Sequence, residues 1–553
     1  MPFIRATAWH HRLALLLVCA AGAGGVQAAT YYVAPAGSDA ANGTSIEIPL
    51  KTIQKAVERA GPGDEIQVRA GTYREDIDIK AGGAAGRLLT IAAYKGETPV
   101  IKGSDIVTGW TQQDANTWKK TDWKINSQQV FVDFDTRPGP PLQQIGMPSR
   151  FYKTFEYPKA VGQGLADMTP GSFFYDPAAG TLYIRLADGS DPNRHTVEVS
   201  TRKNLLRLDA PYVRVQGLAF RHSNVSANMQ QGAAITMSSN SVLDHCDVQW
   251  ADFAGVNLGL NTTGVQVTNS NISNNGDSAI NAPGSYAFRI AGNQLTGNNY
   301  RNFNPLWHAG GVKATTKAYG TVERNEVAHN NGSGIWFDYA NSKQPLIVRN
   351  NFIHDNGPVD SGIFIEVSNN GRVYNNVLAN NARRGIYLSG SDGIHVYNNT
   401  IFGTKGYAGI ELGGMPRQGA TLTDNRVYNN IISHGESRYD LIIAPDNGST
   451  IAGNQSDYNN VYRPNAPIHL ASAGNFTDLR AWQGATHMDE RSISADPDFV
   501  APGAARASAD LEVKPGSPVT RAGKAPDDTV EGATAAPAAG VFPIGASGIA
   551  PRK

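Results

Sequence analysis

The sequence has few cysteines, no excess of either charge and no long apolar run after its first 30 residues. Its 553 residues include two cysteines, Cys19 and Cys246, and Cys19 falls in a leader predicted to be removed. An intrachain disulfide is therefore excluded from the mature chain, and stability must come from a packed core. Lys and Arg total 48, as do Asp and Glu, so the net charge is zero. Neutrality argues against nucleic acid as a partner and against holding a strongly acidic polymer by charge alone.

Residues 1–28 resemble a secretory signal peptide. Arg5 and Arg12 precede the apolar run 13–21, and Val26–Ala28 fits a cleavage site. The run is too short to span a bilayer, and no second one is long enough, so no membrane segment is expected. We expect a secreted or periplasmic protein. The chain also lacks metal-ligand spacing, a Gly-rich phosphate loop and a Ser-centred nucleophile motif, so neither metal nor cofactor is expected.

One short phrase recurs along the middle of the chain. It begins with Gly or Ala, alternates apolar and other residues, and returns about every 23 residues with occasional insertions, which is typical of a solenoid. The seven phrases start at Gly255, Ala279, Gly311, Gly334, Gly362, Gly385 and Gly409.

Alternation within the phrases predicts strands with one buried face. Ile335 and Phe337 are the first and third residues after their Gly, as are Ile363 and Ile365, and a period of two places such pairs on one side of a strand. A second signature is an Asn that recurs 13–14 residues after the first residue of a phrase. Asparagines stacked at this place in successive coils are expected to hydrogen-bond through their side-chain amides. We expect an all-β parallel β-helix.

The remaining segments divide around this repeat. Residues 29–110 are expected to form an N-terminal cap and the first coils, with an amphipathic capping helix within 49–60. Residues 111–200 break the period and predict a β-rich insertion, which either forms one wall of a cleft or only scaffolds the solenoid. Residues 201–494 are assigned to the β-helix with the active site, and 495–553 to a closing coil and tail.

Two carboxylates fall at equivalent places in adjacent repeats. Asp338 and Glu366 both lie four residues after their Gly, so stacked coils would bring them about 5 Å apart. Facing like charges destabilise a sheet, whereas a retaining glycosidase uses two carboxyl groups about 5–5.5 Å apart, one as acid and one as nucleophile. The alternative is a solvated face on which Lys313 relieves the repulsion.

Other outward residues near this pair are candidate substrate contacts. Trp336, Phe364 and Tyr387 predict an exposed aromatic surface on which sugar rings stack, unless they pack against the insertion. Further candidates for substrate binding, each also explicable as a solvated surface residue, are Lys313, His308, Arg384 and Glu411. Of these, Glu411 lies two coils beyond Glu366.

Several motifs resemble known enzyme families. The opening Tyr31–Pro35, Pro49–Gln54 and Gly71–Arg74 are similar to those of secreted right-handed β-helix carbohydrate enzymes. Gly334–Asp338 with Phe364–Glu366 one coil later resembles the β-helix β-xylosidase family of glycoside hydrolases. This resemblance implies a right-handed, pectate-lyase-like solenoid, with Asp338 as nucleophile and Glu366 as acid/base.

The sequence therefore predicts a glycoside hydrolase that cleaves a polysaccharide or a derived oligosaccharide with retention of configuration. A second hypothesis is a calcium-dependent polysaccharide lyase on the same fold, in which Asp338 and Glu366 bind the ion and Lys313 or Arg384 abstracts the proton. A third is a non-catalytic carbohydrate-binding surface solenoid.

Overall fold

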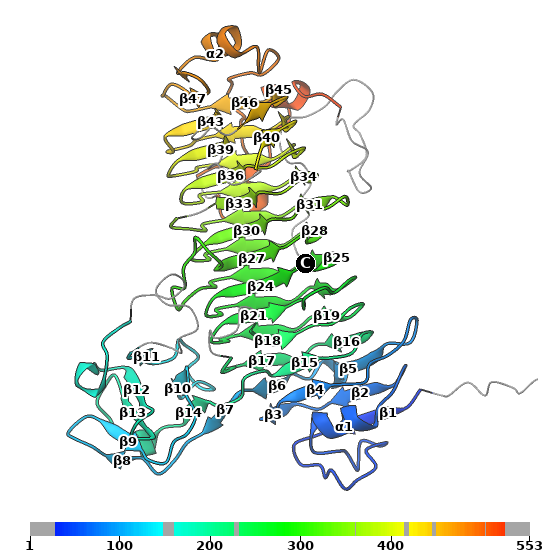
Figure 1. Ribbon diagram of the computed structural model, residues 1–553, viewed down its shortest axis with the longest axis vertical. Coiled ribbons are helices and arrows are strands. Elements are labelled where there is room, and N and C mark those ends of the chain that lie inside the picture. Colours follow the sequence, from blue (N-terminus) through cyan, green and yellow to red (C-terminus); the bar gives the residue numbers. More distant parts are fainter. Residues whose placement is uncertain are drawn as a thin grey trace, which may run out of the picture.

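A computed structural model describes residues 28–146, 160–225, 232–359, 361–413, 420–444, 450–503 and 505–525. Nearly all of the predicted signal peptide and the end of the predicted tail lie outside these ranges. The described chain forms a right-handed parallel β-helix with three long sheets (Figure 1). Sheet A runs from β1 (Thr30–Val33) to β45 (Gln455–Asp457), sheet B from β3 (Gly71–Tyr73) to β46 (Asn460–Tyr462), and sheet C from β4 (Ile77–Ile79) to β48 (Asn475–Phe476). The predicted fold is confirmed.

The seven phrases are consecutive strands of sheet C. They are β21 (Ala254–Asn257), β24 (Ser278–Pro283), β27 (Gly310–Thr315), β30 (Ser333–Asp338), β33 (Ser361–Glu366), β36 (Arg384–Ser389) and β39 (Ala408–Gly413). Ile335 is paired in register with Ile363, and Phe337 with Ile365. All four side chains are completely buried in the main core, as the alternation predicts.

The glycine that opens six of the seven phrases is explained by the close approach of the next coil. A Cβ at Gly334 would lie 2.6 Å from the carbonyl oxygen of Gly362 and 2.9 Å from Cγ2 of Ile353. A side chain there would force the coils apart, so the repeated Gly follows from the stacking of sheet C.

Stacked asparagines connect the coils at the turn between sheets A and B. The Asn351 side-chain amide donates to Oδ1 of Asn376 over 2.9 Å, and Asn376 donates to Oδ1 of Asn399 over 2.9 Å. This is the ladder expected from the sequence. A second ladder, which the sequence analysis missed, runs through Asn275, Asn298, Asn330, Asn356 and Asn381.

A helix lies at each end of the solenoid (Figure 1). α1 (Ile53–Arg59) buries Ile53, Ala56 and Val57 and begins at Thr52, whose side chain accepts a hydrogen bond from the Lys55 amide. It is the predicted cap. At the opposite end α2 (Leu479–Thr486), which was not predicted, buries Trp482 completely. In the described ranges, neither helix is long and apolar enough to cross a membrane.

The insertion interrupts the solenoid between two consecutive coils. The chain leaves after β6 (Pro99–Lys102) and returns at β15 (Leu206–Leu208), which pairs with β4 of the preceding coil. Two small sheets lie between these points, beside the first coils in Figure 1. One contains β7 (Ser104–Ile106), β10 (Val130–Val132) and β14 (Val197–Ser200); the other contains β8 (Thr111–Gln112), β9 (Trp118–Lys120), β11 (Gln143–Gln144), β12 (Ser172–Asp176) and β13 (Thr181–Arg185).

A buried charge network attaches the insertion to the solenoid. Glu198 of β14 is 1% exposed, and its carboxylate accepts hydrogen bonds from Arg74 over 2.7 Å and from Lys102 over 3.0 Å. His222 Nδ1 lies 3.1 Å from Glu198 Oε2, and its ring stacks on Phe131 of β10 at 3.8 Å between centroids. The insertion is therefore fixed to the coils rather than loosely tethered.

Candidate active site

Asp338 and Glu366 end adjacent strands of sheet C on its outer face. They are direct register partners, flanked in the same column by Thr315 and Ser389. Adjacent strands lie about 4.8 Å apart, so the spatial proximity inferred from the repeat is confirmed. Glu366 is 5% exposed, while the Asp338 side chain is 19% exposed. The two carboxyl groups thus form a mostly desolvated pair.

Lys313 neutralises one member of the pair. Its Nζ donates to Oδ2 of Asp338 over 3.0 Å from the preceding coil, and it also lies over the Trp336 ring. Lys313 is itself 4% exposed. Among the described residues no hydrogen bond reaches the buried Oδ1 of Asp338. The ion pair therefore holds the Oδ2 oxygen of the Asp338 carboxylate in a fixed direction.

The aromatic residues form a stacked row, but the predicted exposure is wrong. Trp336 stacks on Phe364 and Phe364 on Tyr387, both at 4.9 Å between ring centroids. The rings face away from the main core, yet they are only 3%, 7% and 8% exposed. Each ring is stacked face to face on its neighbour because the strand spacing matches ring stacking, so little ring surface remains for a sugar.

Arg384 and Glu411 form an ion pair near the end of this row. Arg384 Nε contacts Glu411 Oε2, and the guanidinium carbon lies 4.1 Å from the centroid of the Tyr387 ring. Glu411 follows Tyr387 in the same register column, two coils beyond Glu366 as predicted, but is 2% exposed. The predicted substrate-binding role of this pair has no direct support in this geometry, because each side chain is already engaged with the other.

His308 is held by a buried partner, Asp277, which the sequence analysis did not name as a site residue. Its Nδ1 lies 2.6 Å from Oδ2 of Asp277, and its ring stacks on Phe253. Asp277 is 1% exposed and also accepts from the Ser278 hydroxyl over 2.9 Å. The long insertion before β27 carries His308 back over the coil that holds Asp277, a contact across 31 residues that the repeat spacing alone does not indicate.

Asp338, Lys313 and His308 border one cavity of about 230 Å³, whereas Glu366 is not among its lining residues. Its lining includes Asp338, Lys313, His308, Trp307 and Asn281. The predicted candidates Lys313 and His308 are therefore brought to Asp338. A carboxylate, an ammonium, an imidazole and an amide around a small cavity can bind and orient several hydroxyl groups.

The described part of the chain has one group of three His, Cys, Asp or Glu side chains close enough to share a metal ion. It comprises His329, His354 and Asp355, whose ligand atoms lie within 4.8 Å of one another. His354 belongs to β32 (Phe352–His354) of sheet B, so this group does not include the Asp338 and Glu366 pair.

Two family models match parts of the chain. "Right handed beta helix region" matches residues 235–401, and "Pel9A-like, right handed beta helix region" matches residues 31–135. The first covers the catalytic candidates. The second covers the N-terminal coils and the start of the insertion, away from the Asp338 cavity.

Two curated proteins are similar over short segments. The chain is 40% identical over 75 residues to the uncharacterized protein YwoF of Bacillus subtilis and 43% identical over 83 residues to pectate lyase PEL9 of Emericella nidulans. These alignments cover 14% and 15% of this chain and 16% and 20% of those proteins.

Similar solved structures extend over most of the chain. XylC in complex with xylose has a TM-score of 0.59 at 18% identity, covering 78% of this chain and 83% of XylC. A structure named glycoside hydrolase has a TM-score of 0.53 at 14% identity, covering 77% of this chain and 96% of that one. At such identities these likenesses establish the fold.

Proposed function

We propose that this protein is a glycoside hydrolase that cleaves a polysaccharide or a derived oligosaccharide with retention of configuration. The observation that carries this proposal is the register pairing of Asp338 with Glu366 on the outer face of sheet C. Adjacent strands give a separation near the 5–5.5 Å of retaining enzymes, below the 6.5–9.5 Å that leaves room for water in inverting ones. The binding of xylose by XylC supports a carbohydrate substrate.

Asp338 is assigned as the nucleophile. Lys313 pairs with its Oδ2 and so orients the carboxylate, which attacks the anomeric carbon and forms the glycosyl-enzyme bond as the leaving oxygen departs. His308, whose Nδ1 is held by Asp277, is assigned to hydrogen-bond a sugar hydroxyl in the cavity that Asp338 also lines. The order of roles within the pair follows the resemblance of Gly334–Asp338 to the β-xylosidase phrase.

Glu366 is assigned as the general acid and base. Its burial favours the protonated carboxyl that must give its proton to the leaving oxygen. After that step the same carboxylate takes a proton from water, which attacks the anomeric carbon and releases Asp338. The two displacements on one carbon retain its configuration.

The polysaccharide lyase remains the second candidate, supported by the similarity to pectate lyase PEL9 and to the Pel9A-like family over 31–135. In that reaction Lys313 would remove a proton. Its ion pair with Asp338 favours the charged ammonium, which cannot accept one. The geometry is therefore better suited to hydrolysis.

Product analysis separates the two reactions. Proton NMR of fresh product should show the substrate's anomeric configuration, and no unsaturated sugar absorbing in the near ultraviolet should form with or without chelator. An inverted product would refute the retaining mechanism, and a chelator-sensitive rise in absorbance on an acidic glycan would establish the lyase.

A variant of the acid/base provides a second test. Glu366→Ala should slow substrates with poor leaving groups far more than activated aryl glycosides, because only the former need a proton. Added azide should restore part of the rate by attacking the glycosyl-enzyme. Equal losses on both substrates, with no rescue, would remove Glu366 from this role.

A further inference from the structure

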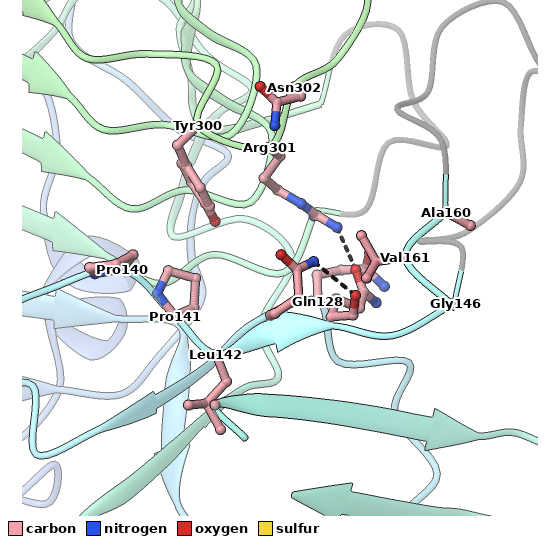
Figure 2. Close-up of a pocket in the computed structure, with 13 residues that line it drawn as sticks. Gln128, Pro140, Pro141, Leu142, Gly146, Ala160, Val161, Tyr300, Arg301 and Asn302 are labelled. Carbon is pink, nitrogen blue, oxygen red and sulfur yellow. Dashed lines mark hydrogen bonds between the residues drawn. The ribbon is translucent and has the colours of Figure 1, made fainter. Parts of the chain in front are cut away.

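A second, larger cavity lies where the insertion meets the solenoid. Its volume is about 470 Å³, within the range of ligand-binding pockets. The insertion supplies one wall, including Pro140–Gln144 and Val161. The solenoid supplies the other through Tyr300, Arg301 and Asn302. Figure 2 shows Tyr300 and Arg301 extending from the solenoid toward the prolines and Gln128 of the insertion.

The lining of this cavity is polar but almost uncharged. Among the described residues it contains three glutamines, an asparagine, a tyrosine and one arginine but no acidic residue, beside an apolar rim of prolines, Leu142 and Val161. Arg301 already donates to Oε1 of Gln144 and lies 3.9 Å from a carboxylate oxygen of Asp252, which balances part of its charge. Amides beside apolar surface suit a neutral ligand with many hydroxyl groups.

Gln128 adds a buried amide to the insertion side of the cavity. It lines the cavity, is 2% exposed, and its Oε1 is buried with no hydrogen-bond partner among the described residues. Its Nε2 is already used by Asn126.

One loop connects this cavity to the one at Asp338. Residues 300–302 line the larger cavity, and Trp307 and His308 line the smaller. Five residues lie between Asn302 and His308, so at full extension the six residue-to-residue steps place the two no more than about 22 Å apart. One extended ligand can therefore contact both ends of the loop.

We propose that the larger cavity is an accessory carbohydrate site that binds a distal, neutral part of the same glycan chain whose other end occupies the Asp338 cavity. This rests on the proposed function for the Asp338 cavity. Binding at both places makes the second contact intramolecular, so affinity should rise with chain length. The substrate class is then a neutral oligosaccharide longer than two units, and the insertion has a role in binding.

The test measures binding by isothermal titration calorimetry in an Asp338→Asn background, which prevents turnover. The probes are xylo-, cello- and manno-oligosaccharides of two and six units. For at least one series we expect the six-unit chain to bind at least tenfold more tightly than the two-unit chain. Gln143→Ala, which removes an exposed lining amide, and Val161→Trp, which fills the cavity from an exposed position, should reduce that ratio below about three. Gln113→Ala, exposed on the same insertion but outside the cavity, should leave it unchanged.

The outcomes distinguish this proposal from the proposed hydrolysis. A ratio near one in every series, or a ratio that neither lining variant changes, overturns the accessory site even if the unmodified protein hydrolyses glycans. A length-dependent ratio lost in both lining variants supports it, even if hydrolysis by the unmodified protein is absent and the proposed function therefore fails. Circular dichroism of each variant establishes that it is folded.

Discussion

Lys313 and Asp338 face each other across two coils of sheet C, with 3.0 Å between Nζ and Oδ2. Lys313 stands in the column of Trp336, whereas Asp338 stands in the column of Glu366. The ion pair therefore links the aromatic row to the carboxylate pair. It fixes the direction of the carboxylate that is proposed to attack.

Loss of this cation should impair catalysis without unfolding the protein. Lys313→Met should lower kcat/KM by about 100-fold, because a misplaced nucleophile loses that much. Lys317→Met, an exposed lysine on the same coil, is the matched control. A kcat/KM for Lys313→Met equal to that of Lys317→Met would show that Lys313 is not needed to position Asp338.

Removal of the proposed nucleophile should have a larger effect. Asp338→Asn should lower kcat by more than about 10⁴-fold, the size of loss seen when a nucleophile is removed, with circular dichroism establishing that the variant is folded. Asp355→Asn changes a carboxylate beside sheet B in the same way and should retain activity. Steady-state kinetics on an aryl glycoside measures both, and substantial activity in Asp338→Asn would exclude it as the nucleophile.

The sequence predicted these two carboxylates because β-strands have a period of two. Counting from the Gly of each phrase placed Asp338 and Glu366 in one column and Ile335 with Ile363 in another, and stacking preserves both columns. The same count predicted that the side chains of Trp336 and Phe364 point outward. It could not give their exposure, which depends on ring-to-ring packing at 4.9 Å along the column.

Contacts made by irregular segments could not be predicted from the sequence. Asp277 and His308 meet because an insertion folds back on its own coil, and Arg74 and Glu198 meet across 124 residues. Neither contact follows from a period, since loops and the insertion have no repeat that fixes their register. The active-site column was therefore predictable, whereas the cavity walls were not.

The Asp277–His308 pair should affect substrate binding through ring orientation. Asp277→Asn replaces a charged acceptor of His308 Nδ1, and hydrogen bonds to charged groups contribute about 1.5–3 kcal/mol. We expect kcat/KM to fall about 10- to 100-fold, with His308→Phe producing a similar loss because Phe keeps the stacking but has no nitrogen. His245→Phe is the control, since His245 pairs with Asp244 in the same way but is mostly exposed outside the cavity. A double variant no worse than either single variant would show that the two residues act as one unit.

The junction between insertion and solenoid should weaken in acid. Burial lowers the pKa of His222 to about 4, although Glu198 opposes this shift. Burial alone would raise the pKa of Glu198, but hydrogen bonds from His222 and Arg74 and the charge of Lys102 lower it below its usual value. Between about pH 6.5 and 4 the unfolded chain binds a proton at His222 that the folded chain does not, so stability should fall as pH falls through this window.

Glu198 contributes in the same direction at lower pH. Its stabilisation is present above its unfolded pKa near 4.5 and decreases as the pH drops below that value. Thermal midpoints should therefore decline from pH 7 to pH 4, and less steeply in His222→Phe, which cannot titrate and preserves the stacking on Phe131. Identical slopes in the two proteins would show that His222 does not control the decline. Glu198→Gln should cost about 3 kcal/mol at pH 7, because it leaves Lys102 without its buried partner.

The asparagine ladder should stabilise the solenoid far more than its side-chain size indicates. Asn376 is completely buried; its Oδ1 accepts from the backbone and side-chain amides of Asn351, and its Nδ2 donates to Asn399 Oδ1 and to the Val348 carbonyl. Asn376→Ala leaves these groups unsatisfied inside the protein, and each costs about 1–3 kcal/mol. We expect the free energy of unfolding to fall by about 3 kcal/mol or more, measured from the urea midpoint. Asn116→Ala, an exposed asparagine of the insertion, should change it by less than about 0.5 kcal/mol. Equal midpoints for the two variants would mean that the ladder is incidental to stability and that stacking of the apolar columns alone holds the coils together.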